Sequence, residues 1–245
     1  MSRIVVLMAI VAGVVLLADL GSPANDVASG QEGPAAEPAV EAVKQVRERG
    51  APVAVLKART NLRAKPGGRV LAKLDKRTEW RSPRVLAVVG AKGKWLRVIA
   101  TELPNDRRGW IALKAASLVA NPWAVRADLS RRRVVVTRNG RVVYRFRVAV
   151  GRPGTPTPRG RFAVTDKLQI AGGSPAYGCC ALALSGKQPH IEPGWQGGNR
   201  LAIHGTRLTH TIGHAASFGC LRARDRHAYW IIKHVFLGTI VEIRP

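Results

Sequence analysis

His204 and Cys220 are the two residues of this sequence whose types and spacing point most directly to catalysis. His204 ends an apolar run and precedes Gly205, whereas Cys220 follows a polar-to-glycine turn at residues 217–219. A free thiol has a pKa of about 8.5, so an imidazole that takes its proton would make Cys220 a nucleophile. From the spacing alone, the alternative is a buried structural cysteine and a core histidine.

A zinc site is a second alternative for the same region. The residues that could supply ligands are His204, His210, His214 and Cys220. The threonines and the glycine around the two middle histidines disfavour a helix there, and no HExxH glutamate is present. The sequence therefore favours a nucleophilic cysteine over a zinc site, while a structural cysteine remains an equal alternative.

The elements that must hold these residues are mostly strands. Residues 133–138 and 141–150 flank Asn139-Gly140, and Asn-Gly between two β-type runs predicts a hairpin. Residues 224–235 carry apolar side chains at helical spacing and predict a short helix after Cys220. Further strands are expected at residues 160–165, 201–204 and 239–243.

Residues 52–119 are a second β-rich segment, in which short apolar runs alternate with turn signals. Five or six strands in about 70 residues predict a small barrel. The segment resembles a bacterial Src-homology-3-like domain, and the stretches that carry the resemblance are 60–63, 66–67, 93–98 and 108–111. Such a module is expected to bind cell-wall peptide or to pack against a catalytic domain, and the alternative is a spacer.

The first fifty residues indicate export. Arg3 precedes a fourteen-residue apolar run at 4–17, and Ser22 and Ala24 fit a secretory cleavage site. Fourteen residues form about 21 Å of helix, short of a hydrocarbon core of about 30 Å. We therefore expect a cleaved signal peptide at residues 1–24, with an uncleaved anchor as the alternative. Residues 25–50 predict a flexible linker, in which 38–49 could form a short helix.

Charge and composition narrow the classes of partner. The 245 residues include 40 Lys and Arg against 15 Asp and Glu, a net charge of +25, and 46% are hydrophobic. The chain can therefore build a core, and its basic surface predicts attraction to a polyanion. An exported protein meets anionic wall polymers, and the basic stretches lack the interleaved aromatic residues of a nucleic-acid binder. We expect no nucleic-acid partner and no stable membrane span.

The motifs around the two candidate catalytic residues resemble the active-site signature of the L,D-transpeptidases, the YkuD-type catalytic domain. They are I-H-G-T at residues 203–206 and S-F-G-C-L-R at residues 217–222. The stretches at 151–162 and 238–243 also match, so the resemblance covers about residues 122–245. Many members have histidine at the position of Phe218. Secreted wall endopeptidases with a similar small barrel have their cysteine before their histidine, and the order here argues against them.

The resemblance implies an all-β fold, mainly β with one short helix after the catalytic cysteine. A small β-barrel at residues 51–120 would precede a YkuD-type β-sandwich at residues 121–245.

The resemblance also implies peptidoglycan cross-linking in the cell envelope, in the periplasm or the wall. Cys220 would form a thioester with a donor tetrapeptide stem, release D-Ala and pass the acyl group to the amine of an acceptor stem. Transfer to water would make the protein an L,D-carboxypeptidase, and a catalytically silent wall-binding protein is a further alternative. Carbapenem-type β-lactams are expected to acylate Cys220, and no metal or cofactor is expected to be needed.

Individual residues receive roles from the same resemblance. His204 is expected to act as base for the thiol and acid for the leaving amine. The oxyanion and loop residues are Gly219, Ser217 and Gly205, with the N–H groups of Gly219 and Cys220 as oxyanion-hole donors. The expected substrate-binding residues are Arg222, Tyr177 and Gly178. Because a vicinal disulfide is strained and rare, Cys179 and Cys180 are expected to be two buried small residues.

Overall fold

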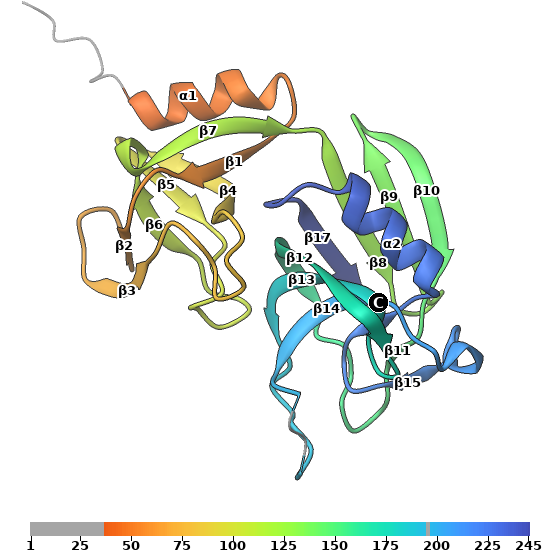
Figure 1. Cartoon of the computed structure of the whole chain (residues 1–245). Coiled ribbons are helices and arrows are strands. Elements are labelled where there is room, and N and C mark those ends of the chain that lie inside the picture. The colour runs from red at the N-terminus through yellow and green to blue at the C-terminus, as the bar shows by residue number, and fades with distance from the viewer. Residues whose placement is uncertain (1–36, 195–196) are drawn as a thin grey trace, which may run out of the picture. The chain divides into compact units, whose positions relative to one another are not determined.

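The computed structural model describes residues 37–194 and 197–245. The predicted signal peptide at 1–24 and the first part of the predicted linker lie outside the described residues. The described residues belong to one compact unit and are mainly β, as predicted, with two α-helices (Figure 1). None of the helices in the described part of the chain is long and apolar enough to cross a membrane.

The N-terminal part is a seven-stranded antiparallel sheet with the order β3-β2-β6-β5-β4-β1-β7. Its strands are β1 (Ala51–Leu56), β2 (Thr60–Arg63), β3 (Val70–Leu74), β4 (Val85–Lys92), β5 (Trp95–Val98), β6 (Gly109–Ala112) and β7 (Ala116–Asn121). A 3-10 turn, η1 (Leu113–Ala115), precedes β7. The predicted small barrel differs from this arrangement, because β3 and β7 are edges and no closed barrel forms among the described strands.

Helix α1 (Pro38–Arg47) occupies part of the segment that was expected to be a flexible linker. Ala39, Val43 and Val46 recur at helical spacing and are all buried. The Ala39 N–H also donates a hydrogen bond to the Gly93 carbonyl, at 2.8 Å. The linker prediction is therefore wrong from residue 38 onward, and the short helix that the sequence also suggested is present.

The C-terminal part is an eight-stranded mixed sheet with the order β10-β9-β8-β17-β12-β13-β14-β16. Its strands are β8 (Trp123–Asp128), β9 (Arg133–Arg138), β10 (Arg141–Arg147), β12 (Gly160–Ser174), β13 (Gly178–Lys187), β14 (Arg200–His204), β16 (Leu221–Arg222) and β17 (Ile240–Arg244). A small parallel pair joins β11 (Val150–Gly151) to β15 (Ala215–Ser217). The predicted hairpin is confirmed, with positive φ at both Asn139 and Gly140.

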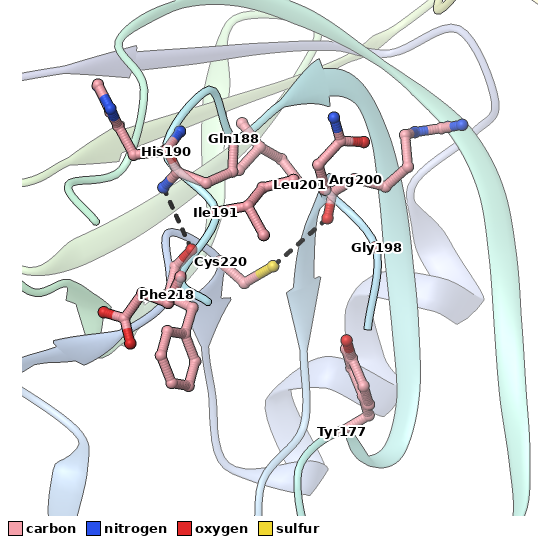
Figure 2. Close-up of a pocket in the computed structure, with 11 residues that line it drawn as sticks. Tyr177, Gln188, His190, Ile191, Gly198, Arg200, Leu201, Phe218 and Cys220 are labelled. Atoms are coloured by element: carbon pink, nitrogen blue, oxygen red, sulfur yellow. Dashed lines mark hydrogen bonds between the residues drawn. The ribbon is translucent and has the colours of Figure 1, made fainter. Parts of the chain in front are cut away.

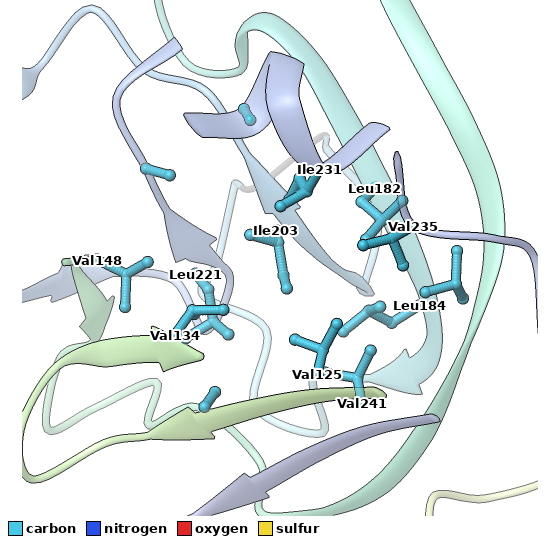
Figure 3. Close-up of a cluster of buried hydrophobic side chains, with 14 of the residues drawn as sticks. Val125, Val134, Val148, Leu182, Leu184, Ile203, Leu221, Ile231, Val235 and Val241 are labelled. Carbon is cyan, nitrogen blue, oxygen red and sulfur yellow. The ribbon is translucent and has the colours of Figure 1, made fainter. Parts of the chain in front are cut away.

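Helix α2 (Asp225–His234) follows the Cys220 turn, as predicted, and it ends before Gly238. Its buried residues Ala228, Ile231 and Ile232 pack into the core beside the site. Figure 3 shows that this core also contains Ile203 of β14 and Leu221 of β16. Fully burying one such side chain contributes about 1.5–3 kcal/mol. The core therefore fixes β14, which ends in His204, and β16, which begins directly after Cys220.

Candidate active site

Cys220 lies in a tight turn between β15 and β16. Gly219 has φ of +114°, and a Cβ there would lie 2.2 Å from the Gln188 Nε2 atom. The Ser217 hydroxyl accepts a hydrogen bond from the Gly219 N–H, at 3.1 Å, and donates one to the Cys220 carbonyl, at 2.6 Å. A side chain at position 219 would therefore displace the turn, and Ser217 holds it closed.

The Cys220 sulfur faces the backbone of β14. Its thiol donates to the Arg200 carbonyl at 3.6 Å (Figure 2). Burial raises the pKa of the Cys220 thiol, while the Ala202 backbone and the Arg222 guanidinium act in the opposite direction. Cys220 is therefore a protonated thiol at neutral pH, beside groups that would favour its anion.

His204 ends β14 and is buried. Its Nδ1 lies 2.6 Å from the Gly205 carbonyl oxygen, and a carbonyl can only accept, so Nδ1 carries the proton. Burial lowers the pKa of His204 to about 4, against the smaller opposite effect of that hydrogen bond. At neutral pH the imidazole is therefore uncharged, and its Nε2 carries a lone pair.

The parallel pairing of β14 with β16 brings the two candidate catalytic residues together. Ile203 pairs with Leu221, and His204 pairs with Arg222. Cys220 immediately precedes this pairing, so the same register places it level with Ala202, two residues before His204 on the neighbouring strand. Among the described residues there is no direct hydrogen bond between the two side chains, and the thiol proton points to Arg200 instead.

Arg222 and Tyr177 both lie close enough to Cys220 to interact with it electrostatically. The Arg222 Nη1 donates to the Ala216 carbonyl at 3.2 Å. Burial raises the pKa of Tyr177, with a further increase from Cys220 and an opposite effect of Arg222. The Tyr177 ring centroid is 4.8 Å from that of His204. The structure thus brings Tyr177 and Arg222, two of the expected substrate-binding residues, to the cysteine.

Gly178 and Gly205 make room for α2. A Cβ at Gly178 would lie 2.0 Å from the Asp225 Oδ1 atom, and one at Gly205 would lie 2.1 Å from the same atom. Gly178 also has φ of +59°. The Gly205 N–H donates to the Cys180 carbonyl at 3.0 Å, which holds Gly205 against β13. Both glycines are therefore packing positions behind the imidazole.

A pocket opens over Cys220 between Tyr177, Phe218 and residues 188, 190–192, 198 and 199. Gln188 is buried there, and its Nε2 donates to the Pro156 carbonyl at 3.0 Å. The same Nε2 donates to the Phe218 carbonyl at 3.2 Å (Figure 2). The Arg152 guanidinium lies 4.6 Å from the Phe218 ring centroid and pairs with Glu192.

Sequence analysis missed the residues that support the cysteine turn, namely Gln188, Arg200 and Arg152. Gln188 and Arg200 belong to no motif, Arg152 lies in the matching stretch 151–162 but received no role, and each of the three acts through a partner distant in sequence. Only the position of Gln188, at the end of a buried run, offered a weak signal.

Cys179 and Cys180 form a disulfide with each other, so the expectation of two separate buried cysteines is wrong. Cys220 is the free cysteine. The Cys179 sulfur also lies 3.5 Å from the Asp225 carbonyl, which ties the start of β13 to α2.

The structure gives the zinc alternative no ligand set. In the described ranges, no three His, Cys, Asp or Glu side chains gather in a way that could hold a metal ion. His210 lies in the short 3-10 turn η2 (Thr209–Thr211), and His214 follows it.

A mainly-β domain with a cysteine turn beside a buried, strand-end histidine defines the class of the L,D-transpeptidase catalytic domains, whose family description matches residues 122–243. A Bacillus licheniformis protein assigned as L,D-transpeptidase YkuD is 32% identical over 124 residues, which cover 51% of this chain and 67% of that protein. Its Bacillus subtilis counterpart is 30% identical over 50% of this chain and 66% of its own length. The chain belongs to the YkuD family of L,D-transpeptidases.

Among solved structures, L,D-transpeptidase 3 from Mycobacterium tuberculosis, in complex with a faropenem-derived adduct, is similar with a TM-score of 0.43. The two chains are 16% identical over 58% of this chain and 69% of that one. An L,D-transpeptidase from Mycobacterium tuberculosis H37Rv has a TM-score of 0.45, with 15% identity over 83% of this chain and 85% of that one.

Proposed function

We propose that this chain is a peptidoglycan L,D-transpeptidase that uses Cys220 as its nucleophile. The observation that carries the proposal is the His204 tautomer. Its Nδ1 proton is held by the Gly205 carbonyl, so the lone pair of Nε2 is left to accept a proton beside the Cys220 turn. Family membership supports the reaction type.

In the acylation step, the Cys220 sulfur attacks the carbonyl carbon of the amide that follows the third residue of a donor stem. His204 Nε2 takes the thiol proton during the attack, because both groups are uncharged at neutral pH. The C–N bond then breaks, the imidazolium returns the proton to the leaving amine of D-Ala, and a thioester to Cys220 remains.

The second step regenerates the enzyme. The side-chain amine of an acceptor stem attacks the thioester carbonyl, and the C–S bond breaks. The amine loses a proton to His204 Nε2, which passes it to the departing sulfur of Cys220. One amide bond is broken and one is formed, so the transfer needs no external energy source. Attack by water instead would trim the stem.

The hydrogen bonds of the turn distinguish between the two candidate oxyanion-hole donors, the N–H groups of Gly219 and Cys220. The Gly219 N–H already donates to the Ser217 hydroxyl, so it is occupied in this structure. We assign the Cys220 N–H as the donor that stabilises the negative charge developing on the substrate oxygen. Ser217 holds the turn in place. Arg222 and Tyr177 face the substrate, where the guanidinium can bind a stem carboxylate.

The proposed place of action is the cell envelope. Its stem peptides are the substrates, and the net charge of +25 favours retention on anionic wall polymers. Carbapenem-type β-lactams are proposed inhibitors because ring opening by Cys220 would leave a stable thioester.

Intact-protein mass after mixing with a carbapenem tests the proposal. We expect one adduct on the native chain and none on Cys220→Ala. With disaccharide-tetrapeptides as substrate, the native chain should then give cross-linked dimers and free D-Ala. A folded native chain with a free thiol that forms neither adduct nor product would overturn the proposal in favour of a silent wall-binding protein.

A further inference from the structure

Two loops of the N-terminal sheet contact the strands that flank the Cys220 pocket. In the loop between β5 and β6, the Asn105 amide bonds Lys187 twice. Its Nδ2 donates to the Lys187 carbonyl at 2.7 Å, and its Oδ1 accepts from the Lys187 N–H at 2.8 Å. Lys187 is the last residue of β13, so Asn105 extends the hydrogen bonding of that strand as another strand would.

The loop between β3 and β4 contacts the first residue of β14, Arg200. The Arg200 Nη1 pairs with the Glu79 carboxylate at 2.5 Å, and its guanidinium lies 5.0 Å from the Trp80 ring centroid. Two further bonds go to the C-terminal sheet: the Arg200 Nη2 donates to the Thr165 hydroxyl at 2.8 Å, and the Arg200 Nε donates to the Leu184 carbonyl at 3.0 Å. Only 16% of the side chain is exposed, so the guanidinium is enclosed by both parts of the chain.

The two contacted residues, Lys187 and Arg200, lie next to residues 188, 190–192, 198 and 199, which line the pocket over Cys220. Lys187 is followed by Gln188, whose amide holds the Phe218 carbonyl in the cysteine turn. The Arg200 carbonyl oxygen accepts a hydrogen bond from the Cys220 thiol (Figure 2). Each of these two loops therefore contacts a residue that either bonds the cysteine turn itself, as Arg200 does, or directly precedes one that does, as Lys187 does.

We propose that Glu79 and Asn105 are positioning residues for the Cys220 site, which makes the N-terminal sheet a structural part of the active site. They act through Arg200 and Lys187, without touching substrate. A spacer, or a wall-binding module that moves freely, needs neither contact. The inference rests on the proposed function only in assigning Cys220 as the reacting atom.

A second polar contact of the loop between β3 and β4 supports this positioning role. Thr78 donates a hydrogen bond to Oδ1 of Asp166, a carboxylate that is 1% exposed on β12. Asp166 and Glu79 both act electrostatically on the Arg200 guanidinium. The loop thus completes a buried charge cluster around Arg200, and breaking such a cluster on one side shifts the groups that remain.

The test compares Asn105→Ala and Glu79→Gln in the full chain with the matched control Asp75→Asn. Asp75 pairs with Arg59 on the same N-terminal sheet, but both side chains are more than 60% exposed. We measure the rate of carbapenem acylation and the pH profile of Cys220 alkylation by iodoacetamide, under non-reducing conditions. Each positioning variant should slow acylation about tenfold and shift the alkylation profile, because small misplacements of a reacting group are costly. The control should change less than about twofold.

A graded variant separates positioning from simple loss of stability. Asn105→Asp keeps the acceptor for the Lys187 N–H and loses the donor, so its rate should lie between those of the native chain and Asn105→Ala. Native rates and a native pH profile in both Asn105→Ala and Glu79→Gln would overturn the inference, as would a lower melting temperature with an unchanged profile. If the native chain forms no carbapenem adduct, the proposed function fails, while the alkylation profiles still decide the inference.

Discussion

The two sheets of this chain differ in how their strands pair, and the candidate chemistry lies in only one of them. In the N-terminal sheet, all pairs between neighbouring strands are antiparallel. The C-terminal sheet contains two parallel pairs, β8 with β17 and β14 with β16. A parallel pair needs a long crossover connection. The connection from β14 to β16 carries the cysteine turn, so the pairing itself returns Cys220 to the strand that ends in His204.

The two sheets therefore contribute to the candidate site in different ways. The N-terminal sheet contacts β13 from outside, through loop side chains such as Asn105. The C-terminal sheet places Cys220 and His204 on neighbouring segments through the register of β14 and β16. Four predictions test this division of roles.

The largest effect is expected at His204. Replacing it with Gln removes the proton acceptor and should slow carbapenem acylation by about 10²–10⁴-fold. The matched control is His210→Gln, an exposed histidine in η2, which should acylate at the native rate. Equal losses in both variants would mean that the histidines act together, as in the zinc alternative, and would contradict the assignment of a single base.

A pH effect on stability is expected next. The pKa of His204 is about 4 in the folded chain and about 6.5 when unfolded, so the unfolded state binds more protons between these values. Stability should therefore be constant above pH 6.5 and fall as the pH drops toward 4, by at most about 3 kcal/mol. Urea unfolding at pH 7, 5.5 and 4 measures this. His204→Gln should lose correspondingly less, and parallel curves for the two proteins would refute the buried, neutral imidazole.

A steric effect is expected at Gly178, where a side chain would meet Asp225. Gly178→Ala should destabilise the fold by about 2 kcal/mol more than Gly67→Ala. Both glycines have positive φ, at +59° and +68°, but nothing lies within 4 Å of a Cβ at Gly67. The backbone strain is thus matched, and the difference isolates the close packing behind His204. Thermal unfolding of both variants measures it, and equal losses would show that only φ matters.

The smallest effect is expected at α1. Val43→Ala should cost about 1.5 kcal/mol, because two buried methyl groups are lost. The control Val40→Ala changes a residue that is 38% exposed on the same helix and should cost less than half as much. Denaturant unfolding that shows no difference between the two would mean that residues 38–47 behave as the flexible linker first expected.

Local signals allowed much of this molecule to be predicted from its sequence. The Asn139-Gly140 turn, the helix after Cys220 and the strand ending in His204 each depend on neighbouring residues, and each appears in the structure. The candidate pair of Cys220 and His204 could be chosen because its motifs are compact and specific.

The parts that could not be predicted depend on partners far away in sequence. Arg200 is one of 40 basic residues, and nothing near it distinguishes it until β3, β4 and β14 are folded. The barrel was expected from strand count, but closure depends on whether the two edge strands pair, which no local pattern specifies. The Cys179–Cys180 disulfide was rejected on general grounds of strain, although the two cysteines lie where β13 begins.

The position of β17 has a consequence for the order in which the chain can fold. This strand, Ile240–Arg244, lies in the middle of the eight-stranded sheet, between β8 and β12 (Figure 1). A ribosome delivers β8 and β12 long before β17, so the two halves of the sheet stay apart until residue 244 has been synthesised. The N-terminal sheet can form earlier, since all of its strands precede residue 122. The half of the molecule that carries Cys220 therefore completes its sheet only after β17 has been synthesised.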